Sequence, residues 1–246
     1  MKTLNIEIHY FLNKSPVITS AHAYRIMEEL KEFELFPQIF QEASPSGGVE
    51  QRFMFTNGVT GLTIRCQRDR FLLIQGVNPN NMLSESTDLH DTLNRLSGML
   101  SKFSATLNNV FATNFIFHRL AIVSRHIEIE RYQEVLSKLL LSTTQELPWV
   151  ESSTKELTLR TGHRFDAEGD KFNSIITISD GLMDLVSSNG ISVNATPCIL
   201  FEIDINSIPE INTDRFDAET TPKNITVIIN KQIETLSEIK KHLEGN

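Results

Sequence analysis

The feature that most constrains the fold of this chain is an order of secondary-structure signals that occurs twice along its 246 residues. Each half opens with a strand pattern, continues with a helix and several short strands, and closes with a long amphipathic helix. Residues 4–11 open the first half, because Leu4, Ile6 and Ile8 alternate with polar neighbours, as in a half-buried strand. The closing helix of this half has an apolar stripe at three- and four-residue spacing, formed by Leu89, Leu93, Leu96, Leu100, Phe103 and Leu107.

A helix and an antiparallel meander are predicted between these two elements. Ser20 is a suitable N-cap for a helix, and we expect that helix to end before Pro37. Residues 52–56, 62–67 and 71–75 have strand patterns, and the segments between them are short enough for hairpins. The first half is therefore predicted to run strand, helix, antiparallel meander, helix.

The second half repeats this order. A strand is predicted over residues 115–125, a helix over 129–141, and a closing helix with Thr221 as its N-cap and Pro222 in its first turn. Three further strands are predicted between the two helices, over residues 156–160, 172–179 and 198–205. The apolar stripe of the closing helix is formed by Ile225, Ile229, Ile233, Leu236, Ile239 and Leu243.

We therefore predict an α+β fold built by tandem duplication of a strand-helix-meander-helix unit. In such an arrangement the two sheets join edge to edge into one curved antiparallel sheet with the helices on one face, as in TATA-binding-protein-like and helix-grip folds. Residues 1–112 form the first half and residues 113–246 the second, with the boundary between Phe111 and Asn114. The halves share element order and little residue identity, so the duplication is inferred from topology alone.

The composition is that of a globular protein, and the net charge limits which kinds of partner we expect. The chain has 40% hydrophobic and 22% charged residues, with a net charge of −8. Because phosphate neutralisation dominates affinity for nucleic acids, this charge argues against nucleic-acid binding by the whole surface and allows only a local basic patch. No apolar run reaches the roughly 18 residues of a membrane helix, and the N-terminal segment alternates, so we expect a cytoplasmic protein without a membrane partner.

The sequence lacks the motifs that are typical of nucleotide-binding and metal-binding sites. There is no Walker or dinucleotide fingerprint, and the seven histidines do not fall in a zinc-binding spacing. Cys66 and Cys198 lie far apart without a CxxC partner, so we expect two small buried side chains rather than a disulfide or a zinc site. We therefore predict no cofactor, no metal and no catalytic residue, and expect that the protein is not an enzyme.

Three polar residues are candidates for ligand contact. Glu7 and His9 project from the same face of the first strand, and His118 lies on the equivalent strand of the second half. If the two strands are related by pseudo-symmetry, their polar faces bring these side chains near one another in a cleft between the halves. The alternative is that all three are solvent-facing residues on half-exposed strands.

The pentapeptide RFDAE occurs twice, over residues 164–168 and 215–219, and both copies are predicted to lie in loops. If the carboxylates of the two copies converged, they could bind a divalent cation, perform acid-base chemistry or form the rim of a partner-binding site. The alternative is a solvated surface, because no nucleophile or oxyanion donor accompanies them. The four carboxylates belong to Asp166, Glu168, Asp217 and Glu219.

Basic and aromatic side chains interleave at one predicted hairpin. Arg65, Arg68 and Arg70 crowd this hairpin, with Arg52 on the adjoining strand and three phenylalanines nearby. Such mixtures form binding platforms for single-stranded nucleic acid. Strand alternation favours a simpler explanation, in which the arginines lie on the wet face of a sheet and residues such as Phe53 lie in its core.

Four segments carry a diffuse resemblance that covers nearly the whole chain. They are IEIHYF at residues 6–11, RDRFLLIQ at 68–75, FHRLAIVSR at 117–125 and ILFEIDIN at 199–206. In these segments the chain resembles a family of sporadically distributed, functionally uncharacterised bacterial proteins of about this length, often encoded on mobile or defence-related islands. The resemblance implies the strand-helix-meander-helix order twice over and supplies no catalytic residue.

We expect a non-enzymatic scaffold or specificity subunit of a multiprotein bacterial complex, such as an anti-phage or toxin-antitoxin system, which assembles as a homodimer or as part of that complex. The missing catalytic motifs, the acidic composition and the large sheet faces motivate this expectation. The alternative is a small-ligand binder or hydrolase that uses a cleft between the sheet and the long helices. A weaker alternative is nucleic-acid binding through the hairpin at residues 65–70.

Overall fold

The computed structural model describes residues 1–13, 16–44, 47–76, 89–146, 157–186 and 192–244, which form an α+β fold as predicted. The strands are β1 (Lys2–Phe11), β2 (Phe36–Ala43), β3 (Val49–Asn57), β4 (Leu62–Cys66), β5 (Arg70–Gly76), β6 (Arg119–Glu128), β7 (Thr158–Ala167), β8 (Asp170–Val186) and β9 (Ser192–Ser207). The helices are α1 (Ser20–Glu29), α2 (Leu89–Phe111), α3 (Tyr132–Glu146) and α4 (Thr220–Glu244).

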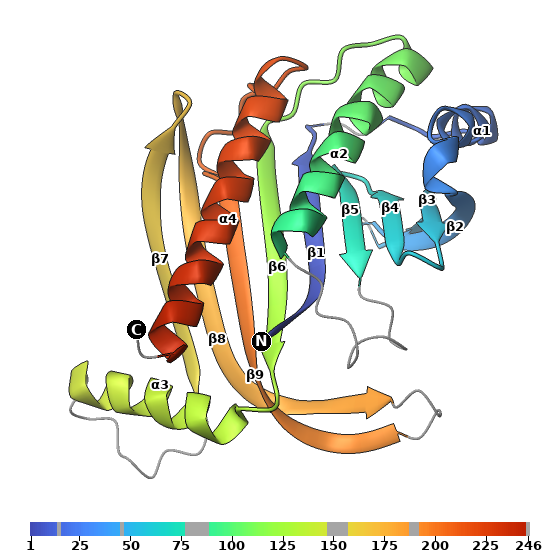
Figure 1. Cartoon of the computed structure of the whole chain (residues 1–246). Helices are drawn as coiled ribbons and strands as arrows, with labels where there is room; N and C mark the ends of the chain where they lie inside the picture. Colours follow the sequence, from blue (N-terminus) through green and yellow to red (C-terminus); the bar gives the residue numbers. More distant parts are fainter. Residues whose placement is uncertain (14–15, 45–46, 77–88, 147–156, 187–191, 245–246) are drawn as a thin grey trace.

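All nine described strands belong to one antiparallel sheet, in the order β2-β3-β4-β5-β1-β6-β9-β8-β7. At its centre β1 pairs with β6, and their register places Ile8 opposite Ile122 and Glu7 opposite Val123. The segments before and after residue 112 therefore share one sheet (Figure 1). The prediction of a single antiparallel sheet is confirmed.

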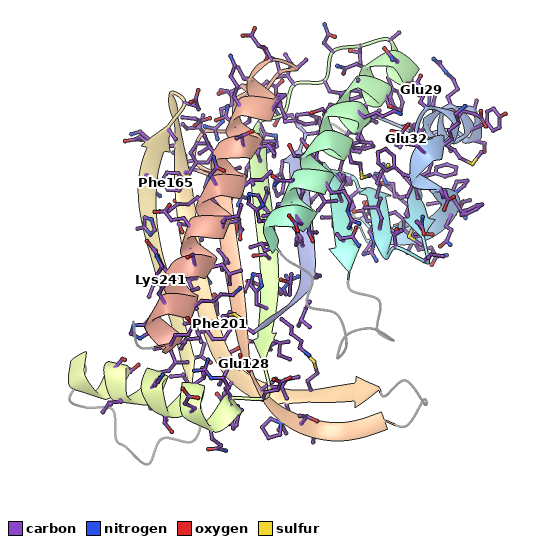
Figure 2. All side chains as sticks on the ribbon, viewed as in Figure 1. Glu29, Glu32, Glu128, Phe165, Phe201 and Lys241 are labelled. Atoms are coloured by element: carbon purple, nitrogen blue, oxygen red, sulfur yellow. The ribbon has the colours of Figure 1, made fainter. Side chains whose placement is uncertain are left out.

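The helices cover one face of this sheet, where α2 and α4 lie over the central strands (Figure 1). Ile6, Ile8 and Tyr10 of β1 are buried in the main apolar core beneath them. Phe201 of β9, labelled in Figure 2, is buried in a second cluster with Leu243 of α4 and residues of α3. No described helix covers the opposite face, which we call the open face.

A buried chain of hydrogen bonds fixes α4 to the centre of the sheet. Gln232 of α4 is fully buried and donates from Nε2 to the carbonyl oxygens of Ile122 (2.6 Å) and Ile203 (2.9 Å). Ser124 Oγ donates to Gln232 Oε1 at 2.6 Å, and His126 Nε2 lies 2.9 Å from the same hydroxyl. Burial lowers the pKa of His126 to about 4, so its ring is neutral at pH 7.

The segment after β1 differs from the prediction. Thr19 rather than Ser20 is the N-cap of α1, because its hydroxyl accepts from the backbone N–H of His22. The helix ends at Glu29, and Pro37 lies within β2, a strand that the patterns did not predict. β2 is an edge strand, which tolerates proline because one side of the strand has no partner to bond. Most of its side chains are exposed, so no buried alternation marks it.

Two further local predictions are wrong. The first RFDAE copy does not lie in a loop, because residues 164–167 belong to β7 and pair with β8. Thr221 is not the N-cap of α4, because Asp217 Oδ1 accepts from the backbone N–H groups of Glu219 (3.0 Å) and Thr220 (2.8 Å). Asp217 therefore caps the helix, and Thr221 is buried in its first turn.

The cysteines and the character of the helices bear on two further predictions. Cys66 and Cys198 are both buried and are not joined by a disulfide, in line with the prediction. Among the described residues, no helix combines the length and the apolar character that crossing a membrane requires.

Candidate functional site on the open face of the sheet

The open face is polar along the central strand β1. Because Ile6, Ile8 and Tyr10 point into the core, the side chains between and after them project from the opposite face. These side chains belong to Glu7, His9 and Phe11. Two of the three residues predicted as ligand contacts therefore lie side by side on the face that no described helix covers.

Phe11 is the centre of a cluster of cationic and imidazole side chains. The register pairs it with Arg70 of β5 and Arg119 of β6, and their guanidinium carbons lie 4.6 Å and 4.8 Å from the centre of its ring. His9 stacks on Phe11 with a centroid distance of 5.7 Å, and the ring of His118 lies 6.2 Å from it. The structure thus brings His9 and His118 to one place, as the sequence suggested.

Several buried polar atoms of this cluster have no hydrogen-bond partner among the described residues. They are Nδ1 of His9, Nδ1 of His118 and Nε of Arg119. His9 is only 9% exposed. Since buried polar groups in folded proteins are nearly always paired, unpaired ones mark a place where water or a ligand supplies the partner.

The cluster lines a hollow of about 490 Å³ on the open face. Burial, with the charges of Arg119 and Arg215, lowers the pKa of His118, so this ring is neutral at pH 7. Burial also raises the pKa of Asp204, another lining residue, whose carboxylate accepts from Asn206 at 2.8 Å. At neutral pH the hollow presents the guanidinium groups of Arg119 and Arg70 next to a neutral imidazole ring, and Arg70 is already paired with Asp69 at 2.9 Å.

Glu7 belongs to an ion-pair bridge beside this hollow. Arg125 of β6 donates to Glu7 Oε1 at 2.5 Å and to Glu202 Oε2 of β9 at 2.8 Å. His9 Nε2 lies 3.4 Å from Glu7 Oε2. The contacts with His9 and Arg125 lower the pKa of Glu7 to about 2, so its carboxylate is ionised. One arginine therefore neutralises carboxylates from both neighbouring strands.

The chemistry of the hollow suits binding. Guanidinium groups bind carboxylate and phosphate oxygens with two parallel hydrogen bonds. None of the described residues that line the hollow is a serine, threonine or cysteine that could act as a nucleophile. Across the described ranges, no three His, Cys, Asp or Glu side chains gather in a way that could hold a metal ion. Arg119, which has no ion pair with a described residue, is therefore the group of the hollow that can bind an anionic group.

The two RFDAE copies lie in different elements, and Arg215 of the second donates to Asp170, at the turn that follows the first, at 2.6 Å. Asp166 and Glu168 lie at the turn between β7 and β8, where Glu168 has a left-handed φ of 51°. Asp217 and Glu219 lie at the start of α4, and Phe216 is buried in the core. Within the described part of the chain these carboxylates do not form a metal-binding group.

The hairpin between β4 and β5 has arginines and phenylalanines on opposite faces. Phe55 and Phe71 are fully buried in the core. Arg52 and Arg65 project from the open face, where Arg52 is paired with acidic neighbours, and Arg68 lies in the connection between the two strands. The phenylalanines that the sequence associated with these arginines therefore lie on the other face, while Phe40 of β2 is opposite Arg52 and Phe11 of β1 lies beside Arg70.

Among the aromatic and charged residues of the site, sequence reasoning missed Phe11, Asp69, Arg119 and Asp204. Phe11 carries a weak signal, because it is an aromatic residue on the face that Glu7 and His9 make polar. Arg119 and Asp204 carry no local signal, since only the pairing of β6 with β1 and β9 brings them to the hollow.

Comparisons with known proteins do not assign the chain to a family. No protein-family model matches the sequence, and a search of the curated proteins finds no match. The site is therefore interpreted from its own residues.

Proposed function

We propose that this protein is a non-enzymatic recognition subunit of a multiprotein bacterial complex and that its open face binds a partner protein whose surface carries both signs of charge, with carboxylates opposite the arginines. The observation that carries the proposal is the Phe11 cluster, where Arg70 and Arg119 lie on one ring and several buried polar atoms lack partners among the described residues. Arginine and aromatic residues are enriched in protein interfaces and contribute much of their binding energy.

Arginine is the main cationic residue of this face. The strand register places on it the side chains of Arg52, Arg65, Arg70, Arg119, Arg125, Arg160 and Arg164. Three of them, Arg65, Arg119 and Arg160, have no ion pair with any residue that the structure describes. These three guanidinium groups are available for the carboxylates of a partner.

A protein partner fits this face better than a nucleic acid. Glu7, Glu202 and Asp204 lie between the arginines, and the whole chain has a net charge of −8. Carboxylates in these positions repel phosphates, which are the main source of affinity for nucleic acids. A protein surface with both signs of charge can complement the same pattern.

The proposed complex belongs to an anti-phage or toxin-antitoxin system. The resemblance of four segments to bacterial proteins encoded on mobile or defence-related islands supports this part of the proposal. An adjacent nuclease, ATPase or toxin gene in the source genome would agree with it, and a position inside a metabolic operon would contradict it.

We also propose that the chain arose by tandem duplication, in a TATA-binding-protein-like or helix-grip-like arrangement. Two observations support this. β1 and β6 pair antiparallel at the sheet centre, and each is followed by a helix, a meander and a long helix (Figure 1). Co-expression of residues 1–112 and 113–246 as separate chains tests it, because two structural units should reassemble into one soluble complex.

Affinity purification from the native host tests the proposed function. We expect the wild-type protein to retain a partner that is lost when Arg65, Arg119 and Arg160 are all changed to glutamate. The matched control changes three exposed lysines away from the open face, Lys31→Glu, Lys223→Glu and Lys241→Glu, and should keep the partner. Equal loss in both variants, or recovery of nucleic acid in place of protein, would overturn the proposal.

A further inference from the structure

A cavity on the helix-covered side of the sheet is separate from the open face. It lies between α2, the first turn of α4 and the end of β1, and has a volume of about 200 Å³. A water molecule occupies about 30 Å³ of liquid, so the cavity can hold a larger molecule. Tyr10 lines it from the sheet, and Thr221 and Ile225 line it from α4.

The cavity exists because α2 presents small side chains toward α4. Ser97, Ser101, Ser104 and Ala105 recur at helical spacing and line the cavity. A leucine at one of these positions would fill part of this space, and unfilled space next to a core reduces stability. The chain therefore keeps an opening at the junction of its two longest helices.

One buried hydroxyl group beside this space has no partner among the described residues. Thr221 is 3% exposed, and its Oγ1 has no hydrogen-bond partner among the described residues. Tyr10 is 1% exposed and lines the same space from the sheet. Burial raises the pKa of Tyr10, so this hydroxyl stays protonated and can donate. Buried hydroxyls are normally paired, which points to a ligand oxygen beside Thr221.

The charge of the lining selects a neutral ligand. Asp217 is the one charged residue among those described around the cavity. Its hydrogen bonds to the start of α4 lower the pKa of its carboxylate, which stays ionised and disfavours an anion. A cation would lose its hydration among mainly apolar walls while this carboxylate is occupied as a helix cap.

We propose that this cavity, the α2–α4 cavity, binds a small, neutral and mainly apolar molecule with one hydrogen-bonding oxygen placed beside Thr221. The site does not depend on the proposed function of the open face, because it lies on the other side of the sheet. A bound molecule contacts both α2 and α4, so it stabilises the packing of the first half of the chain on the second.

Three probes of similar shape test the site by thermal unfolding. They are p-cresol, which has a hydroxyl, toluene, which lacks it, and p-toluate, which is an anion. At ten times its dissociation constant, p-cresol should raise Tm by about 3 °C, because a ligand that binds only the folded state stabilises it. Toluene should bind about fivefold to tenfold more weakly, and p-toluate should produce no shift.

Two variants and a control assign the binding to this cavity. Thr221→Val removes the unpaired hydroxyl at constant shape and should weaken p-cresol binding about fivefold while leaving toluene binding unchanged. Ser104→Leu fills the cavity and should abolish both. Thr226→Val, on the exposed face of α4, is the control and should leave both affinities unchanged.

The unliganded Tm of each variant shows that it folds. The proposal is overturned if none of the probes raises the Tm of the wild-type protein. It is also overturned if p-cresol stabilises the folded Ser104→Leu variant as much as the wild type, since the probe then binds elsewhere.

Discussion

Arg119 of β6 lies over the ring of Phe11 of β1, with 4.8 Å between its guanidinium carbon and the ring centre. The pairing of the two strands sets this contact, because Phe11 and Arg119 are opposite each other at one end of the β1–β6 ladder. Arg70 reaches the same ring from β5. A single aromatic residue thereby holds two cationic side chains at the hollow of the open face.

Replacing Phe11 with alanine should weaken partner binding about tenfold. Each cation–π contact is worth about 0.5–1 kcal/mol, and removing the ring removes both contacts. Titration of the purified partner measures the change. Phe36→Ala is the control, because Phe36 is exposed on the same face at the sheet edge and makes no such contact with a described arginine. Equal losses in the two variants would contradict the role of the Phe11 cluster.

Replacing Gln232 with leucine should reduce the free energy of unfolding by about 2–3 kcal/mol. The change leaves the buried hydroxyl of Ser124 without its acceptor and removes the donor to two carbonyl oxygens. Urea unfolding followed by circular dichroism measures it. Gln133→Leu, on the exposed side of α3, should change stability by less than about 0.5 kcal/mol. If Gln232→Leu leaves the free energy of unfolding unchanged, the buried hydrogen bonds of Gln232 do not fix α4 to the sheet.

The stability of the protein should depend on the titration of His126. Its pKa in the folded state is about 4, below the ordinary value of 6.5, so the unfolded chain binds the extra proton first. The contribution of His126 to the free energy of unfolding is therefore fully present above about pH 6.5. As pH falls toward 4, the free energy of unfolding should decrease by about 2–3 kcal/mol because of this residue.

Unfolding free energies of wild type and His126→Asn between pH 7.5 and 4.5 check this dependence. The variant should have the shallower decline with falling pH. His163→Asn, which changes an exposed histidine of β7, should keep the wild-type slope. Parallel curves for wild type and His126→Asn would refute the assignment.

The Glu7–Arg125 ion pair should stabilise the fold only while Glu7 is charged. His9 and Arg125 together hold the folded-state pKa of Glu7 at about 2, below the ordinary value of 4.5, so their contribution is present above about pH 4.5 and is lost as pH falls toward 2. Because the pair is partly solvated, Glu7→Gln should cost about 1–2 kcal/mol at pH 7 and much less at pH 2.5.

A double-mutant cycle with Arg125→Gln isolates this pair from other titrating groups. Glu130→Gln, at an exposed partner of Lys2, should have little effect at either pH. A coupling energy for Glu7 and Arg125 that is the same at pH 7 and pH 2.5 would contradict the pKa of Glu7.

The α+β class and most of the strands and helices could be predicted from periodicity. β1 and α2 each bury one regular face, so apolar alternation in one and a helical stripe in the other were sufficient. β2 could not be predicted, because it is an exposed edge strand that contains Pro37 and shows no such alternation. The cap of α4 was misplaced because Thr221 and Asp217 both precede an apolar stripe, and only the hydrogen bonds distinguish them.

The candidate site was predictable only in part. Glu7 and His9 share a strand face by alternation alone, and equating the first strands of the two halves brought His118 into the same group. The positions of Arg119 and Asp204 depend on contacts between strands distant in sequence, which no local pattern encodes. Gln232 was also hidden, because a polar residue in an amphipathic helix is normally expected on the exposed side.

Site-directed photocrosslinking in the native host tests the central claim, binding of a protein by the open face, most directly. A benzoylphenylalanine at Thr177 lies on the open face of β8, and one at Thr226 lies on the exposed side of α4. We predict that the Thr177 position crosslinks to one protein and that the Thr226 position does not crosslink to it. Crosslinks to that protein from Thr226 alone, or no protein crosslink from Thr177, would contradict the claim.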